Sequence, residues 1–202
     1  MPRILLTAFE PYDDWQENSS WLTLVELTRW FDAGASLVTR RYPVDFQAVK
    51  QRLAVDMQEE FDAILHLGQA PGSSVLRLES FGINVGSNDQ PLVEGGPSAF
   101  QTRLPLRRWC EKLRERSVPA VISHHAGTLL CNATLYMSQF YAQREHLRTD
   151  STFIHLPLSP QQVADRCESM PSMSVPLMVA GIATILEELL ADNAASPQRL
   201  RL

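Results

Sequence analysis

The sequence lacks most features that would place it in a specialised class of protein. Only 9 of its 202 residues are glycine, which excludes a collagen-like chain with glycine at every third position. It has three cysteines, an odd and sparse set that does not make a disulfide framework. No apolar run approaches the roughly 18 residues of a membrane span, and the first run, Ile4–Leu6, reaches Glu10 too soon for a signal peptide. We therefore expect free thiols and a cytoplasmic protein.

An excess of positive charge is also missing. The chain has 18 basic and 23 acidic side chains and a formal net charge of −5, so it lacks the basic footprint of a nucleic-acid-binding protein. The one basic cluster, between Arg103 and Arg116, is interrupted by Glu111 and Glu115, which is typical of a solvated helix face. GxGxxG, the Walker phosphate loop, GxSxG, HExxH and CxxC do not occur. Their absence disfavours nucleotide cofactors, elbow-type serine hydrolases and the common zinc sites.

What remains is an ordinary globular composition, with 45% hydrophobic and 20% charged residues. A chain of this length can bury roughly 70% of its unfolded surface in one core. We therefore expect a single domain over residues 1–202, with a polar and frayed tail from about Asp192 onward.

Strand-like and helix-like segments alternate along the chain. Short apolar or β-branched runs predict strands, and apolar residues at helical spacing predict helices. The expected strands are 3–8, 37–44, 63–67, 118–123 and 152–156, with 75–85 extended. The expected helices are 20–31, one capped by Asp45, one starting at Pro105, 131–144 and one opening at Ser174.

This alternation indicates an α/β fold with a mostly parallel sheet. In such folds, sites form where the carboxyl ends of strands meet. The segments that follow the expected strands are 9–18, 68–79 and 124–131, together with His155.

Cys131 is the strongest candidate for chemistry. It follows an expected strand and a short loop, and it stands where a helix is expected to begin. Unsatisfied backbone N–H groups at a helix start favour a thiolate and can also bind an oxyanion. Cys110 and Cys167 lack this setting. The alternative for any lone cysteine is a small core residue.

A nucleophilic cysteine needs a base and a group that orients the base. His155 ends a short buried strand, which suits a base, and Glu79 is the acidic residue most embedded in apolar sequence. A structural salt bridge is the alternative for Glu79. His124 and His125 with His66 or His155 offer a weak metal-binding alternative.

Six segments carry a resemblance to a known family. The chain resembles pyroglutamyl peptidase I, a family of cysteine peptidases, and the matches follow one another in order over nearly the whole chain. The matching segments are Leu6-Thr7-Ala8-Phe9-Glu10-Pro11-Tyr12, Asn18-Ser19-Ser20-Trp21, His66-Leu67-Gly68-Gln69-Ala70-Pro71-Gly72, Leu78-Glu79 with Ile83-Asn84, Ala126-Gly127-Thr128 with Cys131-Asn132, and Phe153-Ile154-His155-Leu156-Pro157.

The resemblance implies a single three-layer α/β/α domain that removes N-terminal pyroglutamate from peptides without metal or organic cofactor. It implies Cys131 as nucleophile, His155 as base and Glu79 as the orienting group. It further implies an oxyanion hole from the backbone N–H groups of Gly68, Gln69 and Cys131. The implied contacts with the pyroglutamyl ring come from Phe9, Tyr12, Asn18 and Gln69.

The family is often tetrameric, so we expect a homo-oligomer, a dimer or tetramer. The aromatic content of 101–109 and 139–141 is a further weak indication. An alternative function is a divergent paralogue that hydrolyses another acyl or amide substrate, or only binds a small lactam.

Departures from the family pattern cluster around the expected pocket. Asp13-Asp14 stands where the family has two glycines, Tyr12 replaces a phenylalanine, and the 86–96 loop is altered. Serines at 73 and 80 replace family arginines, which predicts fewer cations near the turn and near Glu79. We expect the chemistry to survive and the pocket to be changed.

Overall fold

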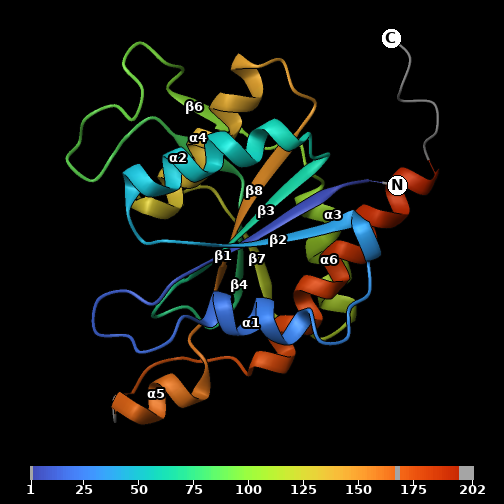
Figure 1. Ribbon diagram of the computed structural model, residues 1–202. Helices are drawn as coiled ribbons and strands as arrows, with labels where there is room; N and C mark the ends of the chain where they lie inside the picture. The colour runs from blue at the N-terminus through green and yellow to red at the C-terminus, as the bar shows by residue number, and fades with distance from the viewer. Residues whose placement is uncertain (1, 167–168, 196–202) are drawn as a thin grey trace.

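The computed structural model describes residues 2–166 and 169–195 (Figure 1). Its centre is a six-stranded sheet in the order β2-β1-β3-β8-β4-β7. The strands are β1 (Ile4–Phe9), β2 (Leu37–Tyr42), β3 (Ala63–Gln69), β4 (Leu76–Glu79), β7 (Ala120–Ser123) and β8 (Asp150–Leu156). A separate two-stranded sheet pairs β5 (Phe81–Ile83) with β6 (Ala99–Gln101).

The sheet is mostly parallel, as the alternation of elements predicts. β2, β1, β3 and β8 pair in parallel, whereas β4 pairs antiparallel with β8. β7 pairs in parallel with β4. β4 and β7 therefore run antiparallel to the other four strands, and their carboxyl ends lie at the opposite end of the sheet.

Helices cover both faces of the sheet and give the three expected layers (Figure 1). One face carries α1, α3 and α6, and the other carries α2 and α4. The helices are α1 (Ser19–Leu27), α2 (Phe46–Asp56), α3 (Leu106–Glu115), α4 (Leu130–Arg144), α5 (Pro160–Arg166) and α6 (Val175–Ala195), with short 3-10 turns at Gly34–Ser36 and Met57–Glu59.

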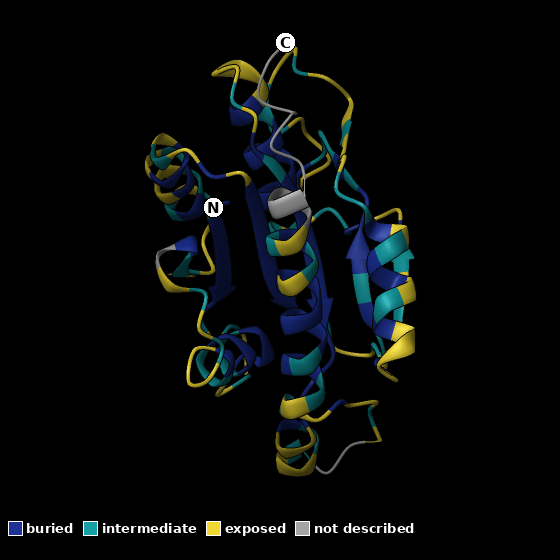
Figure 2. Ribbon diagram, turned by 90° about the vertical axis from the view of Figure 1, so that its right-hand side faces the viewer, coloured by how far each residue is buried: buried dark blue, intermediate teal, exposed yellow. Residues whose placement is uncertain are grey.

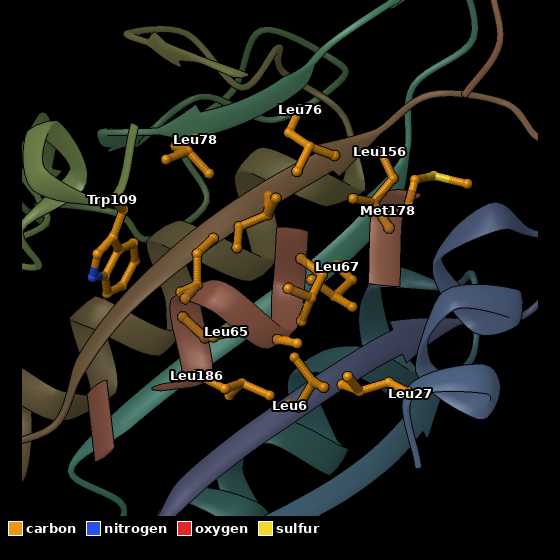
Figure 3. Close-up of a cluster of buried hydrophobic side chains, with 14 of the residues drawn as sticks. Leu6, Leu27, Leu65, Leu67, Leu76, Leu78, Trp109, Leu156, Met178 and Leu186 are labelled. Carbon is orange, nitrogen blue, oxygen red and sulfur yellow. The ribbon is translucent and has the colours of Figure 1, made fainter. Parts of the chain in front are cut away.

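Successive strand residues point to opposite faces and fill two separate cores. In β1, Leu6 belongs to the core under α1 and α6, and Leu5 to the core under α2 and α4. Figure 3 shows part of the first core, where Leu65 and Leu67 of β3 meet Met178 and Leu186 of α6. In Figure 2 the central strands β1, β3 and β8 are buried almost throughout, and the helices expose their outer sides.

Several boundaries differ from the sequence-based expectations. The 75–85 segment is broken at Ser80, whose N–H donates to the carbonyl of Ser123 in the main sheet and whose carbonyl accepts from Thr102 beside the small sheet. The first helix ends at Leu27 instead of 31. The last helix continues to Ala195, and the expectation of fraying from about Asp192 stays a prediction. The rest of that tail lies outside the described residues.

Two further findings bear on the expected partners. Of the residues described, no helix is long and apolar enough to cross a membrane. The aromatic residues offered as weak support for an oligomer are largely internal: Trp109 is completely buried in the first core and Tyr141 is buried in the second (Figure 3).

Candidate active site

A cavity of about 800 Å³ opens where β1, β3 and β8 end and α4 begins. Its walls include Phe9, Tyr12, Gln69, Cys131 and His155. These residues come from separate segments of the chain, and all of them are expected site residues. The expectation that a site forms where the carboxyl ends of strands meet therefore holds for β1, β3 and β8.

Cys131 lies in the first turn of α4 and is partly exposed to the cavity. The residue before the helix, Leu129, makes no capping hydrogen bond through its side chain, and the first turn contains no acidic residue. The first backbone N–H groups of a helix have no intrahelical partner. This end of α4 therefore presents uncapped donors and positive partial charge beside the Cys131 thiol.

The route of the chain to Cys131 differs from the sequence-based expectation. β7 runs antiparallel to β8. Ser123, the last residue of β7, therefore lies at the end of the sheet opposite to the carboxyl end of β8. The connection 124–129 brings the chain to the cavity, which residues from Ala126 onward line. The thiol is placed by the start of α4 and this connection, and not by the carboxyl end of a strand.

Asn132 fixes the start of α4. Its Oδ1 accepts from the N–H of Ile83 at 2.8 Å, and its Nδ2 donates to the carbonyls of Ile83 and Val85 at 2.9 and 3.0 Å. Gly82 allows this approach, because an added Cβ would lie 2.7 Å from the backbone nitrogen of Tyr136 in α4. β5 and α4 are thereby held together next to Cys131.

His155 lies near the end of β8 and is 9% exposed. Its Nδ1 is 2.8 Å from Oε1 of the completely buried Glu79. Because a carboxylate only accepts, Nδ1 carries the proton and Nε2 is the nitrogen left for a second partner. Cys131 lies close enough to raise the pKa of His155, and both side chains line the cavity, so the structure brings the three expected residues together.

The protonation of His155 follows from these contacts. Burial by itself lowers the pKa of His155, but hydrogen bonds to Cys131 and Glu79, and then the negative charges of both groups, outweigh it and raise the pKa to about 9. His155 is therefore protonated at neutral pH. An imidazolium beside a thiol favours the thiolate.

Arg77 supplies a cation that the sequence-based reading of this site did not anticipate. Its Nε lies 3.5 Å from Oε1 of Glu79, and across the β4–β8 pair it stands opposite His155. With serine at position 80, Glu79 still has Arg77 as a nearby cation. Arg77 and Glu79 are two positions apart in one strand and so share a face of the sheet.

Tyr12 and Phe9 form the aromatic wall of the cavity. Phe9 is buried, whereas Tyr12 is partly exposed. Burial, together with the nearby charges of Cys131 and Asp13, raises the pKa of Tyr12 despite an opposing hydrogen-bond effect from Gln69. The phenol therefore stays protonated at physiological pH and can donate a hydrogen bond inside the cavity.

Asn18 and Gln69 line the cavity in different ways. Asn18 is the cap of α1: its Oδ1 accepts from Ser20 and its Nδ2 donates to the carbonyl of Glu10. Its side chain is thus used to shape the pocket. Gln69 accepts from the Ser19 N–H and from Gln162 through Oε1, whereas its buried Nε2 has no hydrogen-bond partner among the described residues. The Gln69 amide also lies close enough to the Tyr12 phenol to oppose the rise in its pKa.

Gln162 is a functional residue that the sequence analysis missed. Its Nε2 donates to Gln69 at 2.6 Å and to the carbonyl of Glu17 at 3.0 Å. It lies in α5, which was not expected either. The signal was present as Ser159-Pro160-Gln161-Gln162, a capping box with proline in the first turn. Ser159 and Gln162 make the two reciprocal hydrogen bonds of that motif.

Gly68 is needed for the packing beneath the thiol. An added Cβ there would lie 2.5 Å from the ring of Phe153 and 3.5 Å from the Cys131 sulfur. β3 pairs with β1 only as far as His66 but with β8 as far as Gln69, so its last residues border the cavity. The oxyanion hole from the N–H groups of Gly68, Gln69 and Cys131 stays a prediction.

The other histidines do not converge on a common point. His66 is completely buried, bonds Thr7 through Nδ1, and has its pKa lowered by burial to about 3. His124 bonds Ser80, and His125 accepts from the N–H of Gly127. Within the described part of the chain, no three His, Cys, Asp or Glu side chains are grouped closely enough to hold a metal ion.

The remaining cysteines differ from Cys131. Cys110 is buried on the inner face of α3, and burial raises the pKa of its thiol. Cys167 lies outside the described residues. Cys110 therefore fits the alternative reading of a lone cysteine as a small core residue.

Comparison with known proteins gives one consistent result. The family model described as pyroglutamyl peptidase matches residues 2–191. A pyrrolidone-carboxylate peptidase from Clavibacter michiganensis is 31% identical over 206 residues, covering 95% of this chain and 94% of the relative. A second relative, pyrrolidone-carboxylate peptidase 1 from Ralstonia nicotianae, is 32% identical over 201 residues. The match covers 93% of this chain and 92% of the relative.

Solved structures agree with the sequence relatives. The pyrrolidone carboxyl peptidase of Pyrococcus furiosus superposes with a TM-score of 0.88 at 30% identity, over 94% of this chain and 99% of that one. The pyrrolidone carboxyl peptidase of Fervidobacterium islandicum superposes with a TM-score of 0.87 at 31% identity. The superposition covers 95% of this chain and 99% of that one. The similarity thus extends over the strands and helices that build the cavity.

Proposed function

The chain belongs to the pyroglutamyl peptidase family, and from this we infer that it is a cysteine-type hydrolase that removes pyroglutamate from the N-terminus of peptides. The observation that carries the assignment to particular residues is the contact of His155 with Glu79, with Cys131 lining the same aromatic-walled cavity and raising the pKa of His155. We propose Cys131 as nucleophile, His155 as acid and base, and Glu79 as the group that orients His155.

The reaction is acyl transfer in two halves. The Cys131 thiolate forms a bond to the carbonyl carbon of the pyroglutamyl residue, and the N–H groups of Gly68, Gln69 and Cys131 are proposed to hold the resulting oxyanion. When the C–N bond breaks, the His155 imidazolium gives its proton to the leaving nitrogen. Neutral His155 then takes a proton from water, which attacks the thioester and releases pyroglutamate.

The pocket suits an uncharged lactam. Phe9 and Tyr12 supply apolar ring faces, and the unpartnered Nε2 of Gln69 supplies a donor for the lactam carbonyl. A free amino terminus would carry a positive charge that must lose its water on entering the aromatic part of the cavity, whereas the lactam carries no charge. We propose that this difference makes pyroglutamate, rather than glutamine or glutamate, the accepted terminal residue.

Turnover of a fluorogenic pyroglutamyl amide tests the proposal. Wild type should release the amine, and Cys131→Ser should lose at least about 10³-fold in kcat/KM because the thiolate is the attacking group. Cys110→Ser is the matched control and should keep the activity. Full activity of Cys131→Ser would overturn the nucleophile assignment, and the absence of turnover by a folded wild type would overturn the substrate.

We also propose a cytoplasmic homo-oligomer, a dimer or tetramer. The family resemblance supports the oligomer. The thiol nucleophile supports the cytoplasmic location, because a thiol needs a reducing compartment to stay free.

A further inference from the structure

The cavity is much larger than one lactam ring. Its volume of about 800 Å³ falls in the range that accommodates a drug-sized ligand. Phe9, Tyr12 and Gln69 belong to its lining, which also includes the apolar side chains of Val44 and Leu129 and polar ones from the 86–92 segment. Val44 and Leu129 are exposed, at 40% and 67%, and mark the outer part of the cavity. If the proposed function holds, the first residues of the leaving peptide occupy this outer part.

One charged side chain distinguishes this outer wall. Among the described residues that line the cavity, Asp13 is the only Asp, Glu, Lys or Arg. Within the described residues its carboxylate makes no hydrogen bond or salt bridge. The negative charge of Asp13 is therefore uncompensated by another side chain.

The backbone holds Asp13 at the cavity. It lies in a turn closed by a hydrogen bond of 3.1 Å from the Trp15 N–H to the Tyr12 carbonyl, and its φ is +49°. Asparagine and aspartate adopt this left-handed region more readily than other side chains do. The carboxylate also contributes, after burial and Cys131, to the raised pKa of Tyr12, so its field reaches the aromatic wall.

We propose that Asp13 makes the site selective for the charge of the residue that follows pyroglutamate, favouring lysine or arginine there and disfavouring aspartate or glutamate. The thiol chemistry does not depend on this choice, because Asp13 acts on the leaving peptide. The inference rests on the proposed function and specifies its substrate class.

A competing explanation is the charge of the whole molecule. With a net charge of −5, the protein repels any acidic peptide to some extent. Asp14 separates the two explanations, because it is the adjacent exposed carboxylate and is not among the residues that line the cavity. Asp13→Asn and Asp14→Asn change the net charge equally, and only the first changes the cavity. Asparagine also tolerates the left-handed backbone at position 13.

The test compares three peptide amides that have lysine, glutamine or glutamate after pyroglutamate. Released pyroglutamate is quantified by chromatography to give kcat/KM. An exposed ion pair changes an equilibrium by a factor of about 1.5–5, and attraction and repulsion multiply in the lysine-to-glutamate ratio, so wild type should show a ratio of about 2–20 at low salt. The ratio should shrink at roughly 0.5 M NaCl, where exposed charges are screened.

In Asp13→Asn the ratio should fall toward 1, and in Asp14→Asn it should stay near the wild-type value. Because each ratio is measured within one variant, a loss of folded protein cancels. A ratio that falls equally in both variants, or in neither, overturns the role of Asp13 while leaving the proposed function intact. Failure to release pyroglutamate from all three peptides overturns both.

Discussion

Two cysteines of this chain have opposite surroundings, and their reactivity should differ accordingly. Cys131 is partly exposed at an uncapped helix start and contacts His155, whereas Cys110 is buried. Limited iodoacetamide at neutral pH should label Cys131 first, because the thiolate is the reactive form. Peptide mapping by mass spectrometry measures the order, and earlier labelling of Cys110 in folded protein contradicts the assignment.

The raised pKa of His155 predicts an alkaline limit to the activity. The imidazolium must protonate the leaving nitrogen, so kcat/KM should fall as pH rises through about 9, where His155 loses its proton. Alkylation of Cys131 should not fall over the same range, because the thiolate persists. His124→Ala is the control and should keep the same alkaline limit. An activity that stays level up to pH 10.5 in wild type would falsify the role of His155 as the acid.

The same pKa has a consequence for stability. A group whose pKa is higher in the folded than in the unfolded state stabilises the fold fully below its unfolded value, near 6.5, and this contribution is lost as pH rises through about 9. The loss is on the order of 3 kcal/mol at most. Urea unfolding at pH 6 and 9.5 should show a smaller difference in His155→Gln than in wild type.

At the scale of elements, α4 depends on one amide side chain. Asn132→Ala removes three hydrogen bonds to β5 and its extension, and each buried group left unpaired costs about 1–3 kcal/mol. We expect a loss of roughly 2–4 kcal/mol in the free energy of unfolding. We also expect a fall in kcat, because Cys131 moves with the helix start. Gln143→Ala, on the exposed side of the same helix, should change neither quantity appreciably.

α5 should act on substrate binding through Gln69. Gln162→Ala removes one of the two donors to Oε1 of Gln69 and leaves only the Ser19 N–H, so the amide is held less firmly in the pocket wall. KM for a pyroglutamyl amide should rise several-fold with a smaller change in kcat, as expected when a binding contact weakens. Gln161→Ala is the matched control, because Gln161 is exposed and bonds only Asp165 within its own helix. Equal effects of the two variants on KM would contradict an action of Gln162 through Gln69.

At the scale of the whole molecule, the expectation of an oligomer now rests on the family alone, since Trp109 and Tyr141 are buried within the chain. Trp30 and Val55 are exposed by 56% and 59%, but they are single residues and not a contiguous patch. Light scattering at micromolar concentration should give two or four times the chain mass of 22.8 kDa. The mass of one chain at that concentration would refute the proposal.

Local sequence patterns determined much of this protein. The buried strands, most helices and the caps by Asn18 and Asp45 follow from apolar spacing and side-chain hydrogen bonding within a few residues. The same patterns place Cys131 at a helix start and His155 at a strand end. These features are readable because each depends on neighbours in the chain. The six family motifs add the pairing of Cys131 and His155 with Glu79.

Only the tertiary structure decided which segments meet. The reversed direction of β4 and β7, the break at Ser80, and the contacts of Arg77 with Glu79 and of Gln162 with Gln69 have no signal in local periodicity. Strand direction depends on how connections cross the sheet, and a contact between residues 93 positions apart depends on how α5 packs beside β3. Both are set by long-range packing, which one sequence window cannot encode.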